Sequence, residues 1–246
     1  MKGMIFAAGI GSRLKPWTDS HPKALAPVAD RPIIARVIDK LLDAGISDIV
    51  VNVHHFASQI VDFLHDNYSH VNIAISDESR LLLDTGGGLL RALPLIGNEP
   101  VLIHNADILT DFDLRDMIDA HSRSGNDVTL LVQPRDTSRY FLFDEQRLRG
   151  WINTSTGECR PADLDPSGLH RLAFGGVHII SPSVFPLLAQ FAPADTPFSI
   201  TNFYINTCSQ LRIGGFSLPD SAHWFDVGKP QSLQQASLWA SHNFPK

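Results

Sequence analysis

The sequence predicts an α/β fold, with a mainly parallel mixed sheet that helices cover on both faces. Two observations lead to this prediction. Short continuous apolar runs, which are typical of strands buried on both sides, alternate along the chain with segments of helical periodicity. Turns rich in glycine or aspartate follow several of the apolar runs. Repeated strand–helix–strand units form right-handed crossovers, so their strands lie parallel in one sheet.

The first half of the chain shows the alternation most clearly. A strand is expected at residues 4–8, and a helix from Pro32, where apolar residues recur at helical spacing until Gly45. The next expected elements, in order, are a strand at 48–54, a helix near 57–65, a strand near 71–75, a glycine-led helix near 89–93 and a strand at 101–104.

The second half is less regular. The polar stretch 153–168 is interpreted as an excursion over the site or as a lobe for a second substrate. No repeat, low-complexity tract or linker interrupts the sequence, which predicts one continuous domain over residues 1–246. The expected elements are a helix near 114–121, strands at 128–132, 140–143, 172–180 and 213–218, and helices at 199–211 and 231–242.

The composition limits the possible partners and the compartment. A net charge of −6 argues against broad binding to nucleic acid or anionic membranes, both of which need a basic face. The two cysteines lack the spacing of a zinc site and are interpreted as free thiols. The N-terminal apolar run is too short for a signal peptide, and no run of about 18 apolar residues follows. These features predict a cytoplasmic protein and leave its oligomeric state open.

A loop after the first strand has the features of a phosphate-binding site. Gly9 and Gly11 predict a sharp turn whose amide groups converge on an anion, and Arg13 and Lys23 add positive charge. A dinucleotide-binding fingerprint needs a small residue at position 14, and a Walker A loop needs glycine there. Leu14 excludes both. The loop is therefore expected to bind a polyphosphate in another way.

Three further segments are expected at the carboxyl ends of strands, where ligands of open parallel sheets bind. The run of three glycines from Gly86 predicts a close approach of the backbone to a flat base. Asp107 follows one apolar strand, and Asp226 comes at the end of another. Carboxylate oxygens at rigid strand ends suit Mg²⁺, which takes one or two protein carboxylates plus phosphate and water oxygens.

Together these segments resemble the signature of the sugar-1-phosphate nucleotidyltransferases. The matching motifs, which cover nearly the whole chain in the family's order, are Ala7–Leu14 with its two glycines, Pro22-Lys23, Asp84–Gly88, Asn105–Asp107, Phe174–Val177 and Asp226–Gly228. The short length and the Thr-Gly-Gly-Gly segment make the chain most similar to the branch that contains N-acetylmuramate 1-phosphate uridylyltransferase. The resemblance implies a Rossmann-like GT-A fold and an enzyme that converts an NTP and a sugar 1-phosphate to an NDP-sugar and pyrophosphate.

The resemblance also implies a role for each matching residue. The catalytic groups would be Arg13, Lys23 and Asp107, and the ligands of Mg²⁺ would be Asp107 and Asp226. Residues 1–113 would form the nucleotide-binding half, and residues 114–246 the sugar-phosphate-binding half. The nucleotide would contact Ala8, Gly9, Gly11, Ser12, Arg13, Lys23, Asp84, Gly86, Gly87 and Asn105, and the sugar phosphate would contact Asn105 and Gly176. Arg139 is expected to contact the sugar phosphate as well, although no family motif matches it.

The chain departs from the family pattern in ways that leave its substrates open. Ala106 stands where the common triplet has glycine, and no Glu-Lys-Pro segment supplies a lysine for the sugar phosphate. Arg135, Arg139 and Tyr140 are candidates for that task, although a structural salt bridge is an equal alternative. No glutamine near Asp84 reads the base. UTP is the expected donor, with GTP, CTP and dTTP as alternatives.

Other functions are weighed against this one. A regulatory protein that binds nucleotide sugars without turnover has no need of Lys23, Asp107 and Asp226. A Rossmann dehydrogenase is disfavoured by Leu14 and by the absence of an acidic residue after the second strand. A transition-metal site among the histidines is disfavoured because their spacing is not that of ligands, so they are interpreted as satisfied core or rim residues.

Overall fold

The computed structural model describes residues 1–145 and 147–244, and its centre is one large mixed sheet. The strands run in the order β11-β10-β13-β8-β12-β6-β1-β4-β5, with β9 paired to β10 and β12. Their bounds are β1 Lys2–Phe6, β4 Asp48–Val53, β5 Asn72–Asp77, β6 Val101–Asn105, β8 Val128–Gln133, β9 Arg139–Asp144, β10 Arg147–Asn153, β11 Glu158–Arg160, β12 His170–Ile180 and β13 Ile213–Ser217.

Two small sheets lie beside the large one. β2 (Pro27–Val28) pairs with β3 (Arg31–Pro32), and β7 (Ile108–Thr110) pairs with β14 (Trp224–Asp226), each antiparallel. The helices are α1 Ile33–Asp43, α2 Ala57–Tyr68, α3 Asp84–Ile96, α4 Leu114–Ser124, α5 Phe185–Phe191, α6 Ile200–Thr207 and α7 Pro230–Asn243.

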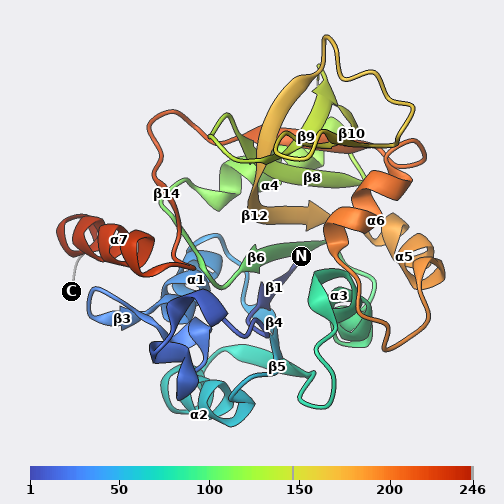
Figure 1. The fold of residues 1–246 in the computed structure, drawn as a ribbon. Helices are drawn as coiled ribbons and strands as arrows, with labels where there is room; N and C mark the ends of the chain where they lie inside the picture. Colours follow the sequence, from blue (N-terminus) through green and yellow to red (C-terminus); the bar gives the residue numbers. More distant parts are fainter. Residues whose placement is uncertain (146, 245–246) are drawn as a thin grey trace.

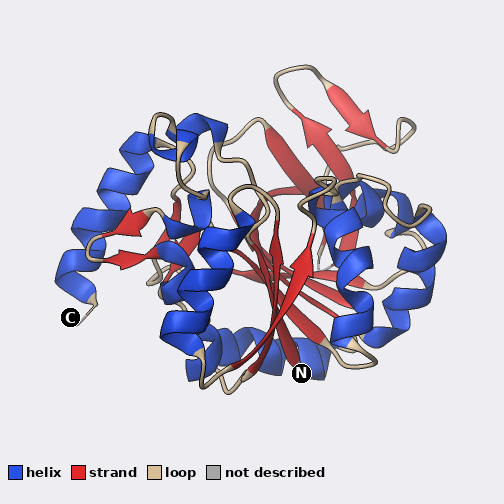
Figure 2. Cartoon of the chain, turned by 90° about the horizontal axis from the view of Figure 1, so that it is seen from below, coloured by secondary structure: helices blue, strands red, loops and turns tan. Residues whose placement is uncertain are grey.

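Helices cover both faces of the large sheet (Figures 1 and 2). The alternation of side chains along β1 separates the two cores, because Ile5 packs with α1, α2 and α4 while Met4 packs with α3, α5 and α6. Both side chains are fully buried. The predicted α/β fold with a mixed sheet and helices on both faces is therefore confirmed.

Parallel pairing is concentrated in the first half of the chain, where the strand–helix alternation predicts it. β5, β4, β1 and β6 pair in parallel, and β13 also pairs in parallel with β8. β12 joins the two parts by pairing antiparallel with both β6 and β8. The remaining pairs of the described large sheet are antiparallel, so the sheet is more mixed than the sequence predicts.

The predicted elements are found with shifted ends, and several short ones are missed. α3 begins at Asp84, so the three glycines lie inside the helix rather than before it. The polar stretch 153–168 contains β11, which pairs with β10. β2, β3, β7, β10 and α5 have no counterpart among the expected elements, whereas the strand expected to end at Asp226 is β14. In the described residues, none of the helices combines the length and apolar character needed to cross a membrane.

Candidate active site

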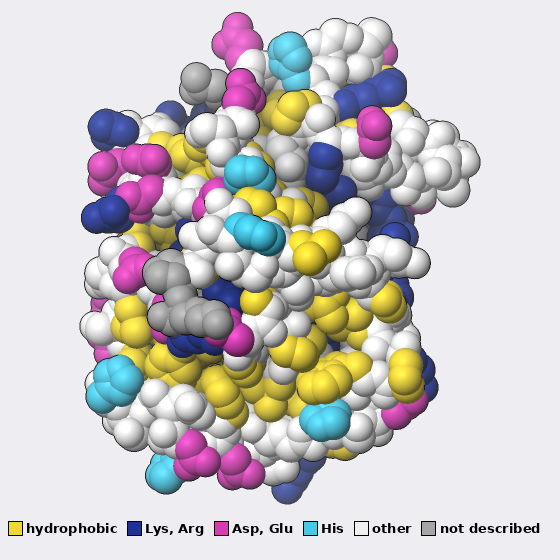
Figure 3. All heavy atoms as spheres, turned by 90° about the vertical axis from the view of Figure 1, so that its left-hand side faces the viewer, with side chains coloured by type: hydrophobic (Ala, Val, Ile, Leu, Met, Phe, Trp, Pro, Cys, Tyr) yellow, Lys and Arg dark blue, Asp and Glu magenta, His cyan; other side chains and the backbone are white. Residues whose placement is uncertain are grey.

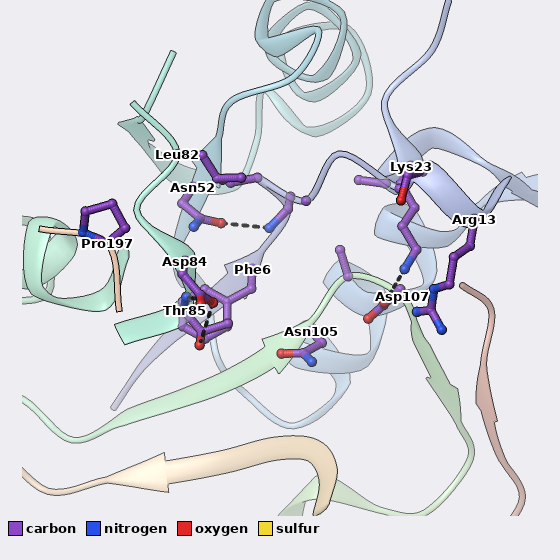
Figure 4. A pocket seen from close by; sticks show the side chains of 17 residues that line it. Phe6, Arg13, Lys23, Asn52, Leu82, Asp84, Thr85, Asn105, Asp107 and Pro197 are labelled. Carbon is purple, nitrogen blue, oxygen red and sulfur yellow. Dashed lines mark hydrogen bonds and ion pairs between the residues drawn. The ribbon is translucent and has the colours of Figure 1, made fainter. Parts of the chain in front are cut away.

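The loop after β1 forms one wall of a cavity of about 520 Å³ at the carboxyl ends of the parallel strands (Figure 4). Gly11 has φ +70°, and a Cβ atom there would lie 2.8 Å from Cβ of Lys23. Only glycine allows both this left-handed conformation and this close contact. The residues that line the cavity are Phe6, Ala7, Ala8, Gly9, Gly11, Ser12, Arg13, Lys23, Ala24, Asn52, Leu82, Asp84, Thr85, Asn105, Ala106, Asp107 and Pro197.

Two cations and two carboxylates gather on one side of this cavity. The Lys23 ammonium forms an ion pair with Asp107, and both side chains are mostly buried. Nη2 of Arg13 lies 3.9 Å from Oδ2 of Asp226. Figure 4 shows Arg13, Lys23 and Asp107 on the same side of the cavity. Residues that are far apart in sequence therefore form one cluster of charged side chains.

Backbone pairing brings the two carboxylates to the same place. Asp107 directly precedes β7, Asp226 ends β14, and in the antiparallel ladder Asp226 stands opposite Ile108. The amide of Val227 donates to the carbonyl oxygen of Asp107 at 2.9 Å. Gly228 follows, where a Cβ atom would lie within 3.0 Å of Arg13, Asp226 and Lys23 atoms. Glycine at this position leaves room for these three charged side chains.

The donor set is of the kind that Mg²⁺ takes when phosphate oxygens complete its coordination. Asp107 and Asp226 are the available carboxylates, and each already has a cation beside it that a bound polyphosphate would also attract. Within the described chain, His, Cys, Asp and Glu side chains form no group of three or more suited to a metal. The two carboxylates thus fit a cation that is held mainly by its substrate.

A hydrogen-bonded pair that the sequence analysis missed supports the phosphate loop. Oδ1 of Asn52 accepts from the amide of Ala7 at 2.7 Å, and Nδ2 of Asn52 donates to Glu78 at 2.7 Å. Glu78 is almost fully buried and also accepts from the amide of Leu83 at 3.0 Å. Burial raises the pKa of Glu78 above its usual value, against the lowering by these two donors. In the sequence, the polar Asn52 inside the apolar run 48–54 is the feature that could have indicated this hydrogen-bonded pair.

Two glycines of α3 have a packing role that the sequence analysis did not predict. Of the three, Gly86 and Gly87 both donate from their backbone amides to the carbonyl oxygen of Phe198. A Cβ atom would lie 2.2 Å from the Phe198 ring at Gly86, and 2.5 Å from the carbonyl oxygen of Thr196 at Gly87. Neither glycine lines the cavity. They allow α3 to pack against residues 196–198, and their expected contact with a base stays a prediction.

The other predicted residues fall into two places. Asp84, with φ +58°, lines the cavity together with Thr85, whose amide donates to Asp84 at 2.6 Å. Asn105 also lines it, and Gly176, with φ +77°, faces the Asn105 side chain, since a Cβ atom there would lie 3.0 Å from Nδ2. Arg139 lies in a second cavity instead.

The second cavity, here called the arginine pocket, has a volume of about 530 Å³. Three arginines and one glutamate provide its charged groups. Pro197 lines the first cavity and Ser199 lines the arginine pocket, so the two cavities share one segment. The lining residues are Arg135, Thr137, Arg139, Phe141, Trp151, Asn153, Glu158, Arg160, Phe174, Ser199, Thr201, Asn202 and Ile205.

Among the described residues the histidines belong to no group of metal-ligating side chains, and two of them lack hydrogen-bond partners that the sequence analysis expected. His104 and His178 are fully buried, and burial lowers the pKa of His104 to about 4 and that of His178 to about 3. His104 contacts the carbonyl oxygen of Asn105 through Nδ1, whereas both ring nitrogens of His178 lack a partner among the described residues. These side chains are neutral core residues at neutral pH.

The fold and the charged cavity define a nucleotide-transferring enzyme, and comparison with known proteins identifies the family. The family model for nucleotidyl transferases matches residues 2–142. The chain belongs to the nucleotidyl transferase family. This finding confirms the resemblance to sugar-1-phosphate nucleotidyltransferases that the motifs indicate.

Individual relatives place the chain more narrowly. It is 32% identical to an N-acetylmuramate alpha-1-phosphate uridylyltransferase of Neisseria meningitidis serogroup B, with 98% of each chain covered. A protein of the same name from Caulobacter vibrioides is 31% identical, over 93% of this chain and 92% of that one. A mannose-1-phosphate guanyltransferase of Pichia angusta is 28% identical, over 95% of this chain and 62% of its own length.

Solved structures support the fold. A putative glucose-1-phosphate thymidylyltransferase from Bacillus anthracis superposes with a TM-score of 0.84 at 22% identity, covering 100% of this chain and 98% of that one. A UDP-glucose pyrophosphorylase complexed with UDP-glucose gives a TM-score of 0.80 at 19% identity, with 98% and 99% covered. The similarity to these structures shows the same overall architecture.

Proposed function

We propose that the chain transfers a uridylyl group from UTP to a sugar 1-phosphate, and that N-acetylmuramate 1-phosphate is the first acceptor to test. The observation that carries this proposal is the cluster of Lys23, Arg13, Asp107 and Asp226 beside the glycine loop. The names of the Neisseria and Caulobacter relatives, which match over most of both chains, support the choice of UTP and of the acceptor.

The chemistry follows from the groups in the cavity. A phosphate oxygen of the sugar 1-phosphate attacks the α-phosphorus of the nucleotide, the bond from this phosphorus to the bridging oxygen breaks, and pyrophosphate leaves. The attacking oxygen is already anionic, so no general base is required. The main barrier is the mutual repulsion of two polyanions. Arg13, Lys23 and the amides of the loop would offset this repulsion and hold the phosphates in line.

Mg²⁺ is part of the proposal. Asp107 and Asp226 would hold the ion, and when bound it would neutralise negative charge that develops on the phosphates. The same proposal places the protein in the cytoplasm, in keeping with the free thiols of Cys159 and Cys208.

Pyrophosphate release from UTP, GTP, CTP or dTTP tests the proposal directly. Each nucleotide is paired in turn with N-acetylmuramate, mannose and glucose 1-phosphates in the presence of Mg²⁺. We expect the highest kcat/KM for UTP with N-acetylmuramate 1-phosphate. A clear preference for GTP would contradict the nucleotide assignment. If no pair releases pyrophosphate and the protein still binds a nucleotide sugar tightly, the regulatory alternative would be favoured.

A further inference from the structure

The arginine pocket combines three arginines with one glutamate and therefore carries net positive charge. Its wall is built from alternate residues of three neighbouring strands, which place their side chains on the same face. In one row Arg139 pairs with Asn153 and Asn153 with Glu158, and in the next row Trp151 pairs with both Phe141 and Arg160. Strand geometry therefore fixes a flat aromatic floor with charged groups along it.

The three arginines are not equivalent. Arg160 is committed to the protein, because its guanidinium pairs with Glu158 at 2.7 Å, contacts Asn202 at 3.3 Å and lies 5.2 Å from the Trp151 ring centre. The Arg139 guanidinium makes no hydrogen bond or ion pair with any residue of the described chain and is exposed to the cavity. Arg139 is thus the arginine that is free to bind a ligand.

Arg135 lies nearest to the reacting end of the site. Its Nη2 donates to the carbonyl oxygen of Phe174 at 3.2 Å, and its guanidinium lies 4.6 Å from the ring centre of Trp224. Trp224 belongs to the same short strand as Asp226, whose charge raises the pKa of Arg135 against the larger lowering by burial. Arg135, in the loop after β8, therefore lies on the side of Asp226, while Arg139 stands on β9 in the wall of the pocket.

We propose that the arginine pocket selects sugar 1-phosphates that carry a carboxylate in addition to the phosphate, and that Arg139 pairs with this carboxylate. The inference rests on the proposed function, since it concerns the acceptor of that reaction. A net negative protein that places three arginines against one glutamate in a cavity of this size creates a local field for an acidic ligand. The planar guanidinium of Arg139 matches a carboxylate with two parallel hydrogen bonds.

A pair of substrates that differ in the carboxylate tests this selection. N-acetylmuramate 1-phosphate carries a lactyl carboxylate that N-acetylglucosamine 1-phosphate lacks. For Arg139→Ala we expect kcat/KM with the muramate to fall by about tenfold to a hundredfold, as for a lost charge-assisted hydrogen bond, and kcat/KM with the glucosamine to change by less than about threefold. Arg139→Lys should restore part of the preference for the muramate, because lysine restores the positive charge but not the two parallel N–H donors of the guanidinium.

The control variant is Arg171→Ala, since Arg171 is exposed on β12 and lines neither cavity. It should leave both substrates unaffected. Equal use of the two substrates by the wild-type protein, or an equal loss with both in Arg139→Ala, would overturn the inference while leaving the proposed function standing. Absence of pyrophosphate release with both substrates and with the wider panel would overturn the proposed function itself.

Discussion

At the scale of single residues, Asn52 shows how a side chain outside any recognised motif shapes the site. Its carbonyl oxygen fixes the first amide of the phosphate loop, and its amide group satisfies buried Glu78. Asp107, Lys23 and Arg13 could be predicted from sequence, because phosphate and Mg²⁺ chemistry restricts the residue types that serve it. The role of Asn52 could not be predicted, because it depends on Ala7 and Glu78, which follow the two strands that flank β4.

His178 makes the folding stability of the protein depend on pH. Burial lowers its pKa from 6.5 to about 3, so below about pH 6.5 the unfolded chain binds a proton that the folded chain does not. Its stabilising contribution is complete above pH 6.5 and decreases as the pH falls toward 3. His178→Phe should keep the aromatic contacts with Phe174 and Tyr204 and remove this dependence. Between about pH 7 and pH 5 the variant should lose about 2 kcal/mol less stability than the wild type.

Urea unfolding at several pH values measures this difference. The matched control is His170→Phe, which changes an exposed histidine on the same strand. Its pH profile should follow that of the wild type. Parallel profiles for wild type and His178→Phe would show that His178 is not a buried neutral group.

At the scale of elements, α3 packs closely against residues 196–198 because Gly86 and Gly87 have no side chains at the contact. Helix propensity alone predicts that Gly87→Ala stabilises the protein by about 1 kcal/mol. The new Cβ atom would lie 2.5 Å from a backbone carbonyl oxygen, which cannot move aside as a flexible side chain does. We therefore expect a net destabilisation of about 1–3 kcal/mol, measured by the denaturant midpoint.

Gly9→Ala serves as the comparison for this prediction. Gly9 has no neighbouring atom within 4 Å of the added Cβ, so its substitution should change stability by less than about 0.5 kcal/mol. A Gly87→Ala protein that is as stable as the wild type would mean that α3 does not pack as closely as the structure indicates.

An element could be predicted where its own residues show how it is buried, and could not where it depends on pairing with a distant segment. α1 and β4 could be predicted because their own residues form a complete apolar face or a doubly buried run. β7 and β14 are three residues each, and they exist only because distant segments pair. β11 lies in a polar stretch where exposed residues alternate with one half-buried cysteine, so no apolar period marks it.

At the scale of the whole molecule, the large sheet and the small β7–β14 sheet together bring the loop after β1, the end of β6 and the end of β14 to one place. Their order along the chain suggested a common site, but the cross-strand neighbours, the arginine pocket and the packing role of the glycines in α3 required the three-dimensional structure. On the face drawn in Figure 3, Lys and Arg side chains are scattered among acidic and apolar ones. In the first cavity Arg13 and Lys23 stand beside Asp84 and Asp107, whereas three arginines and one glutamate line the arginine pocket, where the acceptor is proposed to bind.

The proposed reaction depends most on Asp107, which would hold the catalytic Mg²⁺ for nucleotidyl transfer. Its most direct test is pyrophosphate release from UTP and a sugar 1-phosphate by Asp107→Asn, compared with wild type and with Asp119→Asn, which changes an exposed aspartate on α4. We predict a loss of about a hundredfold or more in kcat for Asp107→Asn with an unchanged unfolding midpoint, an equal loss for wild type in EDTA, and normal activity for Asp119→Asn. Near-normal turnover by Asp107→Asn, or by wild type without a divalent cation, would contradict the claim.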